Sequence, residues 1–88
     1  MGTSETHDIE IRHLDSIKEY FSGIHRKNVK LIEAILHFID THFNAKMGDI
    51  LRITLEFEDY HGYECYISIE QFIPSKAQHR KRLFWNYA

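Results

Sequence analysis

The 88-residue sequence has one cysteine, one proline and four glycines, and no apolar run that approaches the length of a membrane span. A single cysteine excludes an internal disulfide and favours a reducing compartment. A spanning helix needs roughly 18 or more apolar residues in succession. The N-terminus also lacks the apolar core of a signal peptide. These absences predict a cytoplasmic protein that does not enter a membrane.

Several catalytic patterns are also missing from the sequence. It contains no glycine-rich phosphate loop, no nucleophilic-serine motif and no pair of carboxylates in a recognisable acid/base frame. Cys65 falls on the apolar side of a predicted strand, beside Ile67, where a thiol usually acts as a small hydrophobic side chain. The sequence therefore predicts a protein that is not an enzyme and needs no cofactor.

Seven histidines raise the possibility of a metal site. His37 and His42 project about 140° apart on a predicted helix, so they cannot share an ion. His61 precedes Glu64 and Cys65, but those two are adjacent in a strand and point to opposite faces. A zinc site needs three or four convergent ligands, so no metal site is predicted.

The composition is typical of a globular chain, with 43% hydrophobic and 27% charged residues. The length predicts one domain over residues 1–88. Residues 1–7 are polar and are expected to form a disordered leader. Residues 8–12 alternate in polarity and could form either a short edge strand or the approach to the first helix, with the strand favoured.

The clearest pattern is the period-two alternation over residues 51–71, which predicts a β-hairpin. A three-residue loop at Tyr60–Gly62 suits this hairpin, because the last loop residue takes positive φ, which favours glycine. In this register Phe57 lies opposite Cys65 and Leu55 opposite Ile67. The turn and the apolar pattern therefore agree on the pairing.

Two amphipathic helices are predicted before the hairpin. The apolar face of the first contains Leu14, Ile17, Tyr20, Phe21 and Ile24, and Ser16 with Glu19 has the spacing of a capping box. The second runs roughly over residues 28–44, with Asn28 as its N-cap.

More than half the circumference of the second helix is apolar, whereas a helix on one surface needs a stripe of roughly 100°. The first helix or a twin subunit should cover the remainder. His42 lies within this arc, where it is expected to be a core histidine or to line an interface.

Alternation returns over residues 81–87 and predicts a third strand, with a helix over residues 75–84 as the alternative. The predicted fold class is therefore α+β: a two-helix hairpin packed on one face of a three-stranded, possibly four-stranded, antiparallel sheet. The small core and the wide apolar arc of the second helix favour a homodimer.

The polar side of the hairpin combines carboxylates with aromatic side chains. Glu58 faces Glu64 in the predicted register, and like charges directly opposite one another destabilise a hairpin. Tyrosines in an acidic field suit a basic partner surface. The predicted partner-binding residues are Glu56, Glu58, Asp59, Tyr60, His61, Tyr63, Glu64, Tyr66 and Glu70.

These residues favour a small non-enzymatic inhibitor of the immunity-protein, antitoxin or phage-inhibitor type. Its partner would be a basic, nucleic-acid-handling protein such as a toxin or nuclease. Charge asymmetry supports this interpretation, because the segment from residue 76 onward carries four cations and no acid, while the rest is acidic.

Two alternatives remain open. The C-terminal strand mixes cations with aromatic rings, the ingredients of single-stranded nucleic-acid binding. The residues of that alternative site are Lys76, Arg80, Lys81, Arg82, Phe84 and Trp85. The second alternative is a purely structural dimerisation domain.

Overall fold

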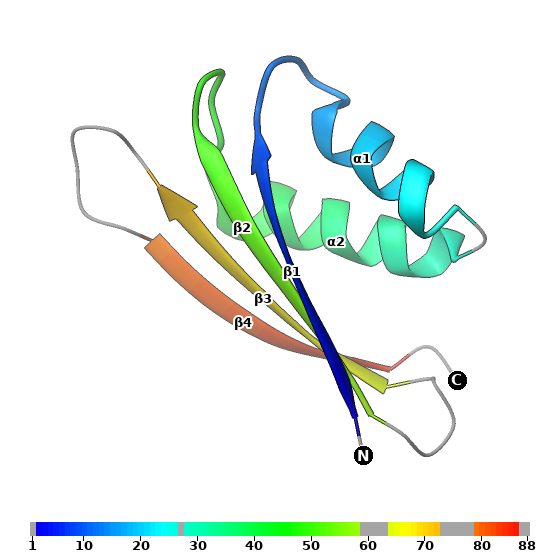
Figure 1. Cartoon of the computed structure of the whole chain (residues 1–88). Coiled ribbons are helices and arrows are strands. Elements are labelled where there is room, and N and C mark those ends of the chain that lie inside the picture. Colours follow the sequence, from blue (N-terminus) through cyan, green and yellow to red (C-terminus); the bar gives the residue numbers. More distant parts are fainter. Residues whose placement is uncertain (1, 27, 59–63, 73–78, 87–88) are drawn as a thin grey trace.

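The computed structural model describes residues 2–26, 28–58, 64–72 and 79–86 of the chain. Its elements, in order, are β1 (Thr3–Glu10), α1 (Ser16–Ile24), α2 (Val29–His42), β2 (Ile50–Phe57), β3 (Glu64–Phe72) and β4 (His79–Asn86). The strands lie in the order β1-β2-β3-β4, each antiparallel to its neighbour. Both helices lie on one side of this sheet (Figure 1). The predicted α+β fold is confirmed, with four strands.

The central hairpin forms in the predicted register. Phe57 pairs with Cys65 and Leu55 with Ile67. Beyond the last paired residues the Glu58 amide donates to the Glu64 carbonyl at 3.1 Å, so Glu58 and Glu64 lie opposite each other as predicted. The predicted loop at Tyr60–Gly62 lies outside the described residues.

The N-terminal segment differs from the prediction. Residues 3–7 were expected to be disordered, but they belong to β1, which pairs with β2 from Thr3 to Glu10. The strand preference for the neighbouring segment is confirmed up to Glu10. The hydrophobic pattern does not reveal the earlier part of β1, because its inner side carries Glu5 and His7. Ile9 is the one buried residue of this strand.

The second helix begins as predicted. The Asn28 side chain accepts a hydrogen bond from the Leu31 amide at 3.3 Å, which satisfies one of the free N–H groups of the first turn. His42 is exposed rather than part of the core, with its ring edge-on to that of Phe38 at a centroid distance of 5.1 Å. The core-histidine expectation is therefore wrong.

The first helix is only partly as expected. Ile17 and Phe21 are buried, but Leu14 precedes the helix and is 98% exposed. The capping box does not form. Instead the Ser16 hydroxyl accepts from the amides of Arg12 and His13, both at 3.0 Å, and so fixes the turn between β1 and α1.

The core lies between the helices and the sheet. Its fully buried side chains are Phe21, Leu31, Ile35, Leu51, Ile53, Leu55, Cys65, Ile67 and Ile69. The last strand, β4, adds the partly buried Leu83 and Trp85, so its segment is a strand and the alternative helix over residues 75–84 is wrong for residues 79–84. Among the described residues no helix has the length and apolar character needed to cross a bilayer.

A buried polar contact secures the connection between α2 and β2. Asp49 and Gln71 are 8% and 2% exposed. The Gln71 Nε2 donates to Asp49 Oδ2 at 2.9 Å and to the Asn44 carbonyl at 3.2 Å, and the Lys46 amide also donates to Asp49 Oδ2. Gly48 has φ of 92° in this turn, a conformation that glycine adopts without steric cost. Side-chain and backbone partners thus replace water around these buried groups.

Candidate functional site

The sheet presents two chemically different faces. In all four strands the odd-numbered residues face the helices, and we call this the covered face; the even-numbered residues form the open face. Burial follows this alternation most clearly in β3, where Cys65, Ile67 and Ile69 are fully buried and the residues between them are not. Any recognition through the sheet must use the open face.

Arginines and carboxylates alternate across the strands of the open face. Asp8, Arg52, Glu70 and Arg80 stand in one row from β1 to β4. The Arg52 guanidinium donates to both carboxylate oxygens of Asp8, at 2.8 and 3.2 Å, and lies 5.0 Å from the centre of the Phe72 ring. The hydrogen bond from Arg52 lowers the pKa of Asp8 below its usual value.

A second arginine, Arg82 of β4, contacts the acidic hairpin from the neighbouring strand. The Arg82 Nη2 donates to Glu56 Oε1 at 3.2 Å, and its guanidinium lies 4.4 Å from the centre of the Tyr66 ring. The Tyr66 ring is in turn 4.9 Å from that of Phe84. Arg82 and Glu56 belong to the two different sites predicted from the sequence, so those sites meet on one surface.

The predicted partner-binding residues divide into two groups. Glu56, Glu64, Tyr66 and Glu70 all lie on the open face, and Glu58 follows directly after β2. The other predicted residues, Asp59, Tyr60, His61 and Tyr63, lie outside the described residues.

The alternative nucleic-acid site is split between the faces of β4. Arg80, Arg82 and Phe84 are on the open face, and Phe84 is 49% exposed. Lys81 and Trp85 are on the covered face, with Trp85 packed against the core, and Lys76 lies outside the described residues. The described residues of this group therefore lie on two faces of β4, and the nucleic-acid hypothesis stays a prediction.

Cys65 lies on the covered face and is fully buried. Burial raises the pKa of its thiol to about 11. A thiol that is protonated and inaccessible at neutral pH is a poor nucleophile, which agrees with the structural role expected for this residue.

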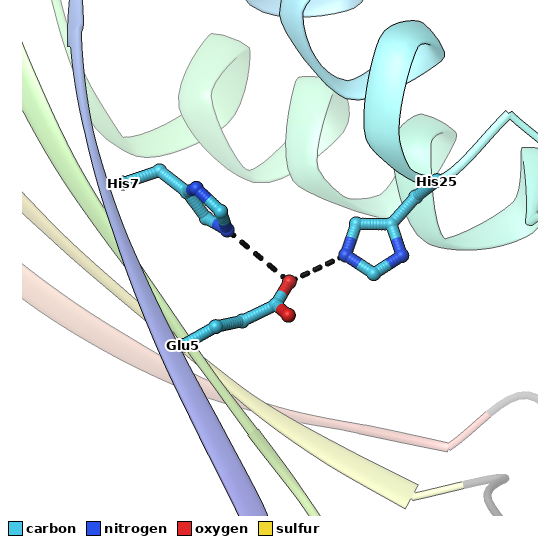
Figure 2. A group of neighbouring side chains, drawn as sticks. All are labelled: Glu5, His7 and His25. Carbon is cyan, nitrogen blue, oxygen red and sulfur yellow. Dashed lines mark hydrogen bonds and ion pairs between the residues drawn. The ribbon is translucent and has the colours of Figure 1, made fainter.

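A polar cluster on the covered side of β1 was not foreseen. Glu5 and His7 of β1 approach His25, which follows the last residue of α1 (Figure 2). His7 Nε2 lies 3.2 Å from Glu5 Oε1, and His25 Nε2 forms a hydrogen bond to the same oxygen. We call these three residues the Glu5–His7–His25 cluster.

The carboxylate of the cluster favours its ionised form. Burial alone would raise the pKa of Glu5, but the hydrogen bonds from His25 and His7, helped by their charges, outweigh burial and lower it. Within the described part of the chain, this is the one group of three His, Cys, Asp or Glu side chains arranged closely enough to hold a metal ion. A sequence search could have paired Glu5 with His7, since i and i+2 share a strand face, but nothing local points to His25.

An apolar groove lies where α1 begins and α2 ends. Its volume is about 840 Å³, and Leu14, Leu36, Ile39 and Met47 are among its lining residues. Leu14 and Met47 are strongly exposed. The contact between α1 and α2 therefore leaves part of the wide apolar arc of α2 uncovered, and the homodimer stays a prediction.

Comparison of the chain with protein-family models, with curated proteins and with solved structures finds no match.

Proposed function

We propose that this chain is a small, non-enzymatic binding protein that neutralises a basic, nucleic-acid-handling protein through the acidic end of its open face. The observation that supports this proposal is the collection of Glu56, Glu64 and Tyr66 on an uncovered sheet face, with Glu58 beside them. Immunity proteins, antitoxins and phage-encoded inhibitors are the classes with this mode of action.

Charge is unevenly distributed along the open face. Toward β1, Asp8 and Arg52 pair directly. At the hairpin end, Glu56 pairs with Arg82, and Glu58 and Glu64 lie opposite each other two residues further along the hairpin. A concentration of carboxylates at one end of a face attracts a basic surface and raises the rate of encounter.

The hairpin also places two glutamates opposite each other, an arrangement suited to a basic partner. The Glu58 amide donates to the Glu64 carbonyl, so two glutamates occupy opposite positions, and like charges in that arrangement repel. A cation of the partner between them would convert this repulsion into attraction. Tyr66, held by Arg82 and Phe84, supplies a rigid aromatic contact next to the acids.

The test compares two charge-matched double variants. Glu58→Gln with Glu64→Gln removes two charges from the acidic end, and Glu33→Gln with Asp40→Asn removes two exposed charges from α2. Partners are captured from native lysate with the wild-type chain, identified by mass spectrometry and purified. Association rates are then measured at low salt.

We expect a basic partner whose association slows about tenfold for the Glu58/Glu64 variant and is unchanged for the α2 variant. The stability of the Glu58/Glu64 variant should equal or exceed that of the wild type, because a repulsion is removed. Equal association rates for both variants would contradict the proposal.

A second candidate function has its own supporting observation. Arg82 over the Tyr66 ring, beside the exposed Phe84, forms a cationic and aromatic surface on which unpaired bases could stack. Fluorescence anisotropy with labelled single-stranded DNA and RNA tests this function. Binding should weaken with salt and disappear with Phe84→Ala. No binding at low salt would exclude it.

A further inference from the structure

We propose that the Glu5–His7–His25 cluster binds a single zinc ion, which joins β1 to the C-terminal end of α1. This site lies on the helix-covered side of the sheet and is independent of the partner-binding function proposed for the open face.

The geometry brings three potential ligand atoms to one point. Glu5 Oε1 lies between the Nε2 atoms of His7 and His25 (Figure 2), and the three ligand atoms are all within 4.8 Å of one another. Zinc binds imidazole nitrogen and carboxylate oxygen at about 2.0–2.2 Å. Small side-chain rotations therefore suffice to place one ion among the three atoms.

The donor set selects the class of metal. Two imidazoles and one carboxylate suit a borderline ion such as zinc, whereas magnesium and calcium prefer oxygen ligands alone. Three protein ligands leave the fourth tetrahedral position of zinc open for water or another ligand. The resulting site would thus be of the two-histidine, one-glutamate type.

A hydrogen bond from outside the cluster orients one ligand. The Nδ1 atom of His7 lies 2.9 Å from the Tyr20 hydroxyl. With Nε2 bound to zinc, Nδ1 carries the proton and donates it to that hydroxyl oxygen, which fixes the tautomer and the ring plane. Histidine ligands in metal sites usually have such a partner.

Aromatic packing restrains the two imidazole rings. His7 lies edge-on to Phe21 at 5.5 Å, and His25 stacks on Phe21 at 6.3 Å and lies 6.1 Å from Phe57. The His7 and His25 side chains retain 16% and 22% of their exposure. The rings are thus largely fixed before an ion arrives, while an ion can still reach them.

The test measures zinc binding to the full chain, without a polyhistidine tag, by isothermal titration calorimetry. His25→Gln removes one ligand, and His37→Gln removes an exposed histidine of α2 as the matched control. We expect one zinc per chain, an affinity at least about 100-fold weaker for His25→Gln, and no change for His37→Gln. Magnesium should give no heat of binding.

A milder variant keeps the test decisive if His25→Gln fails to fold. Tyr20→Phe retains all three ligands and removes only the hydroxyl that orients His7, and zinc affinity should fall about tenfold or more. Cobalt should replace zinc with the visible absorption of a four-coordinate ion. Zinc at a hundredfold excess over its Kd should raise the Tm of the wild type by about 10 °C or more.

Two outcomes would overturn the proposal. Wild-type affinity equal to that of both His25→Gln and Tyr20→Phe would mean that the cluster is a metal-free hydrogen-bonded contact between β1 and α1. An equal loss for His37→Gln and His25→Gln would mean adventitious binding by surface histidines.

Discussion

The two faces of the sheet are stabilised in different ways. On the covered face, fully buried side chains such as Leu55 and Ile67 contribute through removal of apolar area from water, which requires no particular pairing. On the open face, the Asp8–Arg52 and Glu56–Arg82 pairs stay in contact with water, where ion pairs contribute little to stability. The covered face therefore holds the fold together, and the open face can vary its charges for recognition.

The first strand is the exception to this division. Ile9 joins the core, whereas Glu5 and His7 place polar groups on the same covered side. They are satisfied there by His25 and Tyr20, which agrees with the rule that polar groups away from water need partners. The polar half of this covered strand is where the proposed zinc site lies.

The largest difference between the faces should appear when neighbouring residues of β3 are truncated. Ile67→Ala removes a fully buried side chain and should lower the free energy of unfolding by about 2–5 kcal/mol. Ser68→Ala, one residue later on the open face, should change it by no more than about 0.5 kcal/mol. Urea unfolding of both variants measures the difference, and similar losses would show that the faces are not energetically distinct.

A smaller loss is expected when the buried polar contact is broken. Gln71→Leu removes the donor to Asp49 Oδ2 and leaves a buried carboxylate with one hydrogen bond fewer. The cost should be about 1–3 kcal/mol, measured by urea unfolding. Glu70→Gln on the open face is the control and should be nearly neutral. A stabilised Gln71→Leu variant would refute this account of the contact.

The smallest effect is expected for the ion pair of the open face, tested with Arg52→Ala. The pKa of Asp8 lies below its ordinary value of 3.8 because Arg52 donates to it. A carboxyl group whose pKa is lowered on folding stabilises the folded state at pH values above its ordinary pKa. This contribution is lost as the pH falls through the lowered pKa. The small stability difference between wild type and Arg52→Ala should therefore vanish in acid, as unfolding curves at neutral and low pH would show. If the stability difference persists in acid, it arises from packing of Arg52 on the Phe72 ring and not from the ion pair.

Local patterns in the sequence predict the hairpin and the start of α2. Alternation across residues 51–71 and the Asn28 cap depend on neighbours in the chain, and such signals are visible without a structure. Residues 3–7 of β1 escaped prediction because their pairing with β2 joins residues far apart and the inner positions among them include Glu5 and His7, which are polar. The exposure of Leu14 was missed because α1 begins after it, at Ser16.

The candidate sites were predictable only in part. Alternation within each strand, with the register set by the predicted turn, put Glu56 on the same side of the hairpin as Tyr66. The role of Arg82 requires the register between β3 and β4. The Glu5–His7–His25 cluster requires the packing of α1 on β1, which no spacing in the sequence specifies.

The strand order has a consequence for how the chain assembles. Strands β2, β3 and β4 follow one another in the chain and each pairs with the next, whereas Glu10 pairs with Ile50 across a segment that contains both helices. Closing so long a segment is entropically costly and slow. We therefore expect β1 to dock after the other three strands and to detach before them, so that the contacts holding β1 set the lifetime of the folded chain.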